Sequence, residues 1–284
     1  MVGRAVLNYA QGSTVLSWFF KGDEYVHVRW SPGSTKGQKI YFGPTKWTNG
    51  LGCLKETGFH KIDSILSLPQ NIYLRHYHEA YFFCDDKYAL VELYPNGFFP
   101  WVSEIPRSSD SESGGSDDSS DDDPGRGAIL PAWFEVKEGS FPRTAPKLLS
   151  TGNISDIWPS LAKAGFNRID GAVMNPHRSN EAYVFNRTQY CHIRFTWGGG
   201  RDEILDGPNA IEGCWAGMDF AEIEAIIPCP RWKRTAHVRK AYVFCEDQYA
   251  QIRFHASESS SDTKKTGRRD IVEEWPCLKQ AGFY

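Results

Sequence analysis

Four short segments of the sequence carry an oxygen-bearing side chain at a matching position within an apolar run. These side chains belong to Asn8, Asp63, Asp170 and Glu224. Carboxylate and amide oxygens suit hard cations such as calcium. If the fold brings the three negative charges together, they favour a polyamine or another small cation over an anion. The same side chains could instead hydrogen-bond neighbouring backbone and hold strand ends in register. The residue types therefore indicate either a cation site or a structural role.

Three histidines are the candidates for binding haem or a transition metal. His76 and His78 precede one aromatic strand pattern, and His177 precedes another. Ligation requires two such side chains to face one open site. Isolated loop histidines are far commoner, so we do not expect haem.

The seven cysteines are odd in number and form no C-x-x-C pair, and the chain is long enough to fold without disulfides. Cys84 and Cys245 occupy the same position in two copies of a strand pattern, as packing residues do. We therefore predict that the cysteines are buried, small apolar residues. Neither a catalytic thiol nor a zinc site is expected.

Known catalytic motifs are absent from the sequence. There is no G-x-S-x-G, no H-E-x-x-H, no P-loop and no G-x-G-x-x-G followed by a helix. The glycine run 198–200 is better explained as a turn at a strand end. The sequence favours a binding protein over an enzyme.

Charge is unevenly distributed along the chain. The net charge is −3, but the run 108–123 alone holds seven acidic residues and no basic one, so the rest is mildly basic. Such a weak, spread-out charge does not predict nucleic-acid binding. Two loop clusters could bind an acidic partner, bind the chain's own acidic run, or carry only solvated charge. They are Arg231, Lys233, Arg234, Arg239 and Lys240, and Lys264, Lys265, Arg268 and Arg269.

A strand pattern that occurs four times must position these residues. Each copy is an aromatic strand with a central Phe, a four-residue polar connection and a Tyr that opens a second alternating run, which predicts a β-hairpin. The copies are 18–25, 81–88, 183–190 and 242–249.

Two further elements accompany each hairpin. A segment that ends in a Phe, in most copies just after a Gly, predicts one or two helical turns, and a fourth strand is predicted at 40–44 and 204–208. The hairpin tyrosines lie 63, 102 and 59 residues apart, so the second repeat carries an insertion, at about 96–146. Its Ser-, Gly- and Asp-rich middle, 107–127, is predicted to be disordered.

Four strands in each repeat of roughly 60 residues predict an all-β fold, a four-bladed β-propeller with a short helix after each blade. The predicted blades are about 4–59, 60–166 (with the insertion), 167–220 and 221–284. The Asn8, Asp63, Asp170 and Glu224 segments are then the inner strands, and they converge on a central tunnel.

On these motifs the chain resembles the hemopexin-like repeat family. The motifs are the A-Y-x-F-x-x-x-x-Y hairpin, the fourth strand with Gly-Pro, the W-P-x-L helix ending in G-F and the Asp-containing inner strand. The plan looks closest to stand-alone four-repeat seed albumins of the pea albumin-2 type. The resemblance implies that backbone carbonyls at and near Asn8, Asp63, Asp170 and Glu224 ring the tunnel and hold calcium or another axial cation.

The chain departs from the family pattern in three places. The inner-strand acid is replaced by Asn8 and Glu224, the first and third repeats lack Trp-Pro, and the terminal disulfide of secreted members has no equivalent near Met1. No signal-peptide-like or membrane-spanning apolar run is present. We therefore expect a cytoplasmic protein.

Three functions follow from the predicted fold. The first is non-enzymatic binding of a metal ion or a small cationic, polyamine-like ligand in the tunnel. The second is a lectin-like, carbohydrate- or protein-binding module that uses the aromatic loop residues Trp30, Trp47, Trp197 and Trp232. The third is an enzyme of specialised metabolism that orients its substrate in the tunnel mouth.

Overall fold

The computed structural model describes residues 5–11, 14–31, 34–68, 79–93, 145–229, 239–255, 263–264 and 266–283. For strand residues 8–11, 14–15, 34–37 and 263–264 it describes the backbone alone.

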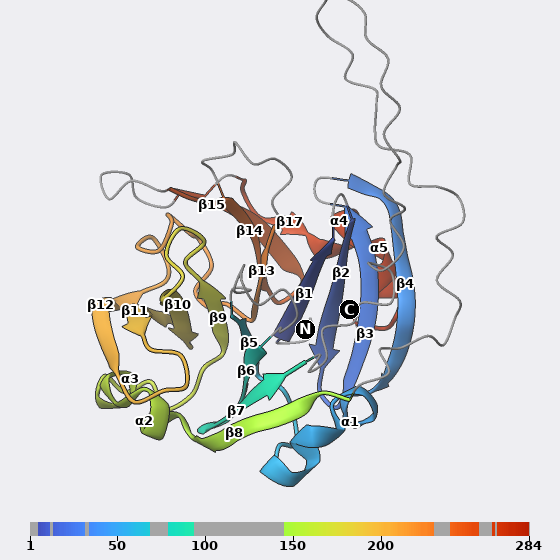
Figure 1. Ribbon diagram of the computed structural model, residues 1–284. Helices are drawn as coiled ribbons and strands as arrows, with labels where there is room; N and C mark the ends of the chain where they lie inside the picture. The colour runs from blue at the N-terminus through green and yellow to red at the C-terminus, as the bar shows by residue number, and fades with distance from the viewer. Residues whose placement is uncertain are drawn as a thin grey trace, which may run out of the picture.

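The chain forms four antiparallel sheets, and each is built from strands that follow one another in sequence (Figure 1). The first holds β1 (Ala5–Gln11), β2 (Thr14–Lys21), β3 (Glu24–Ser31) and β4 (Ser34–Lys46). The second holds β5 (Ser64–Ser67), β6 (Glu79–Cys84), β7 (Lys87–Glu92) and β8 (Lys147–Asn153). The third holds β9 (Gly171–Met174), β10 (Glu181–Asn186), β11 (Gln189–Phe195) and β12 (Asp202–Ala210). The fourth holds β13 (Ala225–Pro228), β14 (Arg239–Cys245), β15 (Gln248–Phe254), β16 (Thr263–Lys264) and β17 (Arg269–Asp270).

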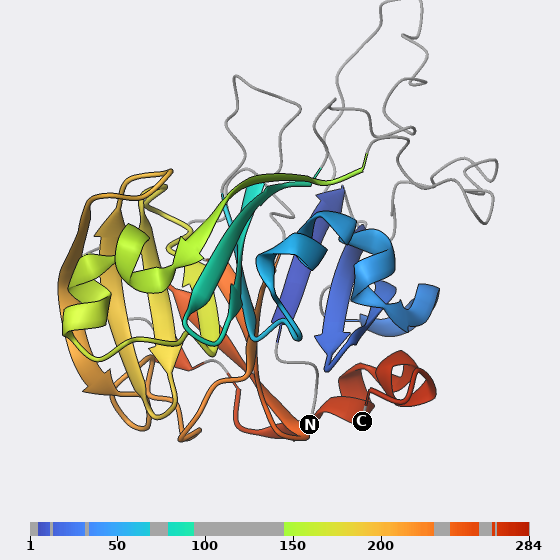
Figure 2. The same ribbon diagram turned by 90° about the horizontal axis from the view of Figure 1, so that it is seen from below.

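The first strand of each sheet lies at the centre of the molecule. β1 contacts β5 and β13, and β9 contacts the same two strands, so these four strands close a ring around one axis. The sheets radiate from that ring as blades (Figures 1 and 2). The predicted all-β, four-bladed propeller is confirmed.

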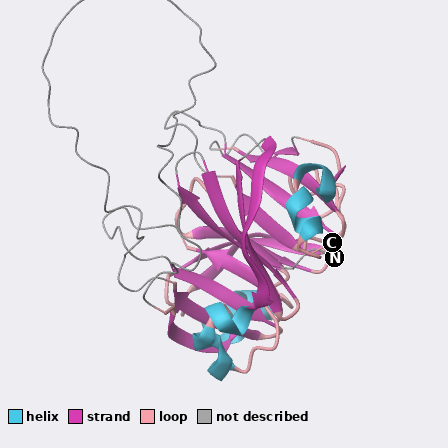
Figure 3. Cartoon of the chain, turned by 90° about the vertical axis from the view of Figure 1, so that its right-hand side faces the viewer, coloured by secondary structure: helices cyan, strands magenta, loops and turns pink. Residues whose placement is uncertain are grey.

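Short helices lie at the outer edge of the blades (Figure 3). They are α1 (Trp47–Gly50), the 3-10 helix η1 (Gly52–Thr57), α2 (Ile154–Ile157), α3 (Pro159–Lys163), α4 (Ile271–Glu274) and α5 (Pro276–Gln280). After the third blade, residues 211–217 form turns instead of a helix, and Gly213 and Gly217 both adopt positive φ there. Within the described residues, no helix has the length and apolar character needed to cross a membrane.

The predicted fourth strands 40–44 and 204–208 lie within β4 and β12. Each contains a glycine with positive φ, Gly43 at 86° and Gly207 at 100°, followed by a cis peptide bond to proline. A Cβ atom on Gly43 would lie 2.6 Å from the carbonyl oxygen of Tyr25 on β3. Glycine is therefore required where the outer strand approaches its neighbour this closely.

Alternation along the strands sends side chains to both faces of each blade. On β6, Phe82 packs against the first blade, with its ring centroid 6.5 Å from that of Phe20. Tyr81 and Phe83 point the other way, and both lie within 5.5 Å of Trp158 in the interface with the third blade. The aromatic-x-Phe pattern therefore supplies two different blade interfaces from one strand.

Four clusters of buried apolar side chains fill the four blade interfaces. The cluster between the fourth and first blades closes the ring, because Trp275, which joins α4 to α5, lies 5.5 Å from Phe19 and 4.6 Å from Trp30 between ring centroids. The Lys21 ammonium also donates to the carbonyl of Gly282 at 2.8 Å. Apolar packing and this hydrogen bond join the last helices to the first blade.

The predicted insertion falls between β7 and β8, which pair with each other although residues 93–146 separate them. Of the interval 96–146, only residues 145 and 146 are described, so the predicted disorder of 107–127 lies outside the described residues.

All seven cysteines are free. Cys84, Cys191 and Cys277 are buried, as predicted for packing residues, whereas Cys214 is exposed. Cys53, Cys229 and Cys245 are half-buried. The prediction of uniform burial is therefore met only in part, and it is wrong at Cys214, which follows the left-handed Gly213 in the turn segment after the third blade.

Candidate functional site

The three predicted acids stand immediately before the inner strands β5, β9 and β13. The backbone N–H of Asp63 donates to the carbonyl of Phe83 at 2.9 Å, and that of Asp170 does the same to Phe185 at 2.9 Å. Glu224 repeats this pairing with Phe244 at 3.0 Å. The three acids thus occupy one equivalent position, at the end of the axis where the hairpin turns lie, which we call the turn end.

Each of these carboxylates also accepts a hydrogen bond from the hairpin turn of its own blade. The donors are the backbone N–H groups of Asp85 to Asp63 at 2.9 Å, Arg187 to Asp170 at 2.9 Å, and Glu246 to Glu224 at 3.0 Å. All three donor residues have a positive φ, between 51° and 55°. The carboxylates therefore support turn residues in a conformation that non-glycine residues seldom adopt. This is the structural role that the sequence left open beside cation binding.

Asn8 is not the first-blade equivalent of the three acids. In β1, Ala5 pairs with Phe20, as Ser64 pairs with Phe83 in the second blade. Asn8 pairs with Ser17, three residues further along the strand, or about 10 Å. The equivalent of Asp63 is residue 4, which lies outside the described residues.

Basic side chains already contact two of the acids. Asp63, whose side chain is 1% exposed, lies 3.1 Å from the Lys61 ammonium and 3.5 Å from the Arg168 guanidinium. Arg168 also binds Asp170 at 2.6 Å. Burial opposes the charge on Arg168, but the neighbouring carboxylates of Asp170 and Asp63 outweigh it and raise its pKa. At Lys61 as well, burial opposes the charge, and hydrogen bonds to Asp85 and Asp63 raise the pKa.

The formal charge at the equivalent positions differs between the blades. Three positions recur at the turn end of the second, third and fourth blades: the residue two before the inner acid, the acid itself, and the turn residue that donates to it. They are Lys61, Asp63 and Asp85 in the second blade, Arg168, Asp170 and Arg187 in the third, and Glu222, Glu224 and Glu246 in the fourth. Their formal charges sum to −1, +1 and −3, so the fourth blade carries the excess negative charge.

A cavity of about 140 Å³ opens where the third and fourth blades meet at this end. It is lined by Arg168, Asp170, Arg187, Glu222, Ile223 and Glu224. Two of the four predicted metal-site residues, Asp170 and Glu224, therefore share one polar cavity, whereas Asp63 is buried beside Lys61 and Arg168. Glu222 and Arg168 were not among the residues predicted for this site, although each lies two residues before an acid in the aligned repeats.

The aromatic residues predicted to bind a sugar or a protein separate into two groups. Trp30 and Trp47 are buried, at 1% and 2% exposure, and pack in blade interfaces. Trp197 is 40% exposed, in the loop between β11 and β12, at the end of the blade opposite the turn end. Trp232 lies outside the described residues.

The histidine and basic clusters give little further support for a ligand site. His76, His78, Arg231, Lys233, Arg234 and Lys265 lie outside the described residues. His177 is anchored to the next blade, with its Nε2 atom 3.3 Å from the carbonyl oxygen of Phe254. Arg268 lies 3.7 Å from Asp219 and 5.0 Å from the centre of the Phe220 ring, so its guanidinium group already has partners within the chain.

Comparison with known proteins agrees with this architecture. Albumin-2 of Lathyrus sativus is 24% identical over 221 residues, which are 71% of this chain and 90% of that protein. The solved structure of the hemopexin fold protein CP4 from cow pea is 19% identical with a TM-score of 0.65, covering 98% of this chain and 97% of CP4. No protein-family profile matches the chain.

Two chickpea structures are also similar. A Cicer arietinum albumin showing hemagglutination is 17% identical, with a TM-score of 0.64 over 99% of this chain and 97% of that one. A Cicer arietinum lectin with two metal binding sites is 19% identical, with a TM-score of 0.63 over 98% and 96%. The fold is thus that of a hemopexin-type four-bladed propeller. Among proteins of this fold the chain is similar to the seed albumins, and the resemblance seen in the repeats is confirmed.

Proposed function

We propose that this chain is a non-enzymatic binding protein that takes a small cation at the turn end of its axis, on the side of the fourth blade. The ligand is calcium or the amine end of a polyamine-like molecule. The observation that carries the proposal is the set Glu222, Glu224 and Glu246, three carboxylates at positions where the second and third blades include a base. Oxygen donors of this kind suit hard cations, and their summed charge attracts amines.

The size of the cavity supports this class of ligand. Pockets for drug-sized molecules measure about 300–1,000 Å³, whereas the cavity beside Glu222 and Glu224 measures about 140 Å³. An ion with a few water molecules or a slim alkylamine fits such a volume, and haem does not. Arg168 and Arg187, which also line the cavity, belong to the third blade, so the cation is expected closer to the fourth.

The test compares the wild type with the double variant Glu222→Gln, Glu224→Gln. Glutamine at 224 keeps an oxygen acceptor for the Glu246 N–H and removes the charge. Calcium or spermine should raise the melting temperature of the wild type, and titration calorimetry should show at least about tenfold weaker binding in the double variant, since each 1.4 kcal/mol of lost attraction is tenfold. Glu273→Gln, an exposed acid on α4, is the control and should bind as the wild type does.

Equal affinity in the double variant and the wild type would show that the cation binds elsewhere. The absence of any shift with either ligand would remove the proposal.

Glycan binding is the second candidate, because one similar structure is of a lectin and another is of an albumin showing hemagglutination. The exposed Trp197 offers a ring face for a sugar. Glycan-array binding that survives both a chelator and the Glu222→Gln, Glu224→Gln substitutions would favour this function over cation binding.

A further inference from the structure

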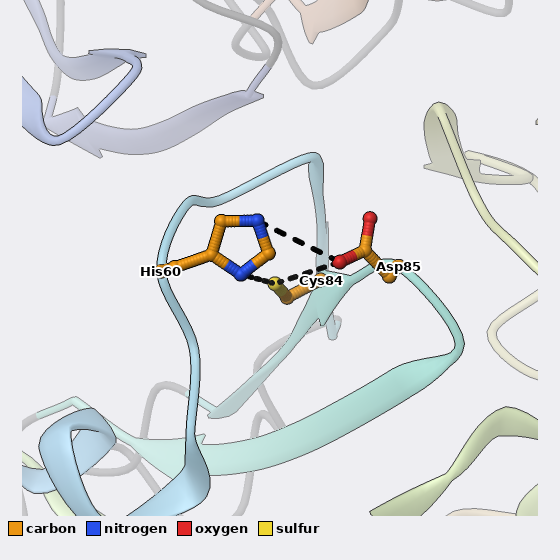
Figure 4. Close-up of side chains that lie close together, drawn as sticks. All are labelled: His60, Cys84 and Asp85. Carbon is orange, nitrogen blue, oxygen red and sulfur yellow. Dashed lines mark hydrogen bonds and ion pairs between the residues drawn. The ribbon is translucent and has the colours of Figure 1, made fainter.

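Three side chains with strong metal-binding chemistry meet at the hairpin turn of the second blade. They are His60, from the segment that leads into β5, Cys84, the last residue of β6, and Asp85, the first residue of the turn (Figure 4). One ligand atom from each residue lies within 4.8 Å of those of the other two. His60 is exposed, Cys84 is buried and Asp85 is intermediate, so the group lies at the surface with one open side.

The separations are close to those that a tetrahedral metal ion requires. His60 Nδ1 lies 3.7 Å from Cys84 Sγ, and Cys84 Sγ lies 3.9 Å from Asp85 Oδ2. His60 Nε2 lies 3.7 Å from the same carboxylate oxygen. Zinc bond lengths of about 2.0–2.3 Å at tetrahedral angles place two ligands of one ion roughly 3.3–3.7 Å apart. The two contacts of His60 use different ring nitrogens. Binding one ion therefore requires the imidazole to turn one nitrogen toward it, and the exposed ring is not held by packing against such a rotation.

Neighbouring groups orient two of the three ligands. The Lys61 ammonium binds Asp85 Oδ1 at 2.7 Å and leaves Oδ2, the oxygen nearest to His60 and Cys84, directed at the group. This hydrogen bond lowers the pKa of Asp85, so the carboxylate is ionised. Burial raises the pKa of Cys84 and outweighs the backbone N–H groups of His60 and Lys61, which face its sulfur and act in the opposite direction. Partners of this outer kind hold ligands in place at metal sites.

The combination is specific to the second blade among the three whose corresponding residues are all described. The third blade has Asn167, Asn186 and Arg187 at these positions, and the fourth has Ala221, Cys245 and Glu246. A structural need of the hairpin would not select histidine, cysteine and aspartate together in one repeat only. The half-buried Cys245 shows that a cysteine at the end of this strand occurs without the other two.

We propose that His60, Cys84 and Asp85 bind one divalent transition-metal ion of the zinc type, with water in the remaining position. A thiolate, an imidazole and a carboxylate form a donor set that suits zinc and differs from the all-oxygen set that calcium prefers. On binding, the thiol proton of Cys84 is released to solvent and a sulfur–metal bond forms. The site is separate from the cavity between the third and fourth blades and does not depend on the function proposed there.

The experiment is a cobalt(II) titration of the reduced, tag-free, full-length chain, because cobalt reports its ligands in its absorption spectrum. We expect one equivalent to bind with a thiolate-to-cobalt charge-transfer band and the intense visible bands of tetrahedral coordination, and zinc to displace it. Cys84→Ala and His60→Ala should each weaken binding by more than about tenfold. Removing an outer-shell partner usually costs about tenfold or more, and these two residues are proposed as direct ligands. Cys245→Ala, the matched cysteine of the fourth blade, should leave the charge-transfer band unchanged.

The His60→Ala variant keeps the test decisive if Cys84→Ala fails to fold, because the imidazole is largely exposed and its removal leaves the buried packing intact. Absence of a charge-transfer band in the wild type would overturn the proposal. So would a band that persists unchanged in His60→Ala, or one that disappears in Cys245→Ala.

Discussion

At the scale of single residues, the turn-end acids show how one side chain can combine a structural and an electrostatic role. The Asp63 carboxylate accepts the N–H of the left-handed residue Asp85 and also lies against Lys61 and Arg168. A charged acceptor stabilises an N–H donor about twice as well as a neutral one. The same carboxylate that holds the turn therefore also sets the charge at the end of the axis.

His27 gives a residue-scale prediction about pH. Its ring is 2% exposed, stacked 4.3 Å from Trp18, and burial lowers its pKa to about 3. The unfolded chain binds a proton at His27 below its ordinary pKa of about 6.5, whereas the folded chain does not until about 3. The stability linked to His27 is therefore complete above pH 6.5 and is lost as the pH falls through this window.

Between pH 7 and pH 5 this loss amounts to about 2 kcal/mol, measured as the change in the free energy of unfolding by denaturant. His27→Phe, which keeps an aromatic ring against Trp18, should remove that part of the pH dependence, while His255→Phe should retain it. An unchanged slope in His27→Phe would mean that His27 is protonated in the folded protein.

At the scale of elements, the outer strands depend on two glycines that allow the chain to approach its neighbour. Gly43 on β4 and Gly207 on β12 both have positive φ, and a Cβ on either would lie 2.6 Å from a carbonyl oxygen of the adjacent strand. The register of both strand pairs shifts at this point. The glycines therefore mark where the blade edge bends.

Gly43→Ala should lower the free energy of unfolding by about 1–3 kcal/mol, the cost of holding a non-glycine residue in this conformation, and the contact with Tyr25 adds to it. Gly52→Ala in η1 is the control, because a Cβ there meets nothing within 4 Å. Urea unfolding of both variants measures the difference. Equal stability of the two would show that β4 moves away from β3 at little cost.

Element-scale patterns were predictable where they are local. The aromatic-x-Phe run, the turn and the Tyr lie within eight residues, so their repetition defined all four hairpins and the propeller. The register of β1 could not be predicted in this way, because it depends on how β1 pairs with β2. Leu7-Asn8 looks like Ile62-Asp63, but β1 and β2 are joined by only residues 12 and 13, so β1 is longer than β5 and its pairing moves Asn8 three places from the acid position.

The candidate sites were predictable only in part, because they depend on contacts between distant residues. Asp63, Asp170 and Glu224 share a position, but their basic partners follow from side-chain packing, as in the Arg168 contact with Asp63 across two blades. His60 and Cys84 are 24 residues apart and meet because the backbone of Asp63 pairs with Phe83. No short motif records that approach, which is why the absence of C-x-x-C made a zinc site look unsupported.

At the scale of the whole molecule, four apolar interfaces hold the ring together, and the one between the fourth and first blades joins the two ends of the described chain. Trp275 is fully buried and contacts Phe19 and Trp30 of the first blade and Phe244 of the fourth. Stability of the ring therefore depends on a residue near the end of the sequence.

Trp275→Ala should lower the free energy of unfolding by about 3–5 kcal/mol, the usual cost of removing a large buried aromatic side chain. Trp197→Ala removes the same side chain from a position that is 40% exposed and should cost about 0.5 kcal/mol. Guanidinium unfolding followed by circular dichroism compares the two. A loss below about 1 kcal/mol in Trp275→Ala would show that the ring closes without this contact.

The unequal charges at the turn end have one more consequence. Four blades of one backbone design approach fourfold rotational symmetry, and a symmetric ring would offer a ligand on the axis equivalent binding positions in every direction. Charges of −1, +1 and −3 on three successive blades break that symmetry and give the end of the axis a lateral dipole. A bound cation would therefore lie to one side of the axis, next to the fourth blade. Blades that share one backbone design would in this way present different chemistry to a ligand.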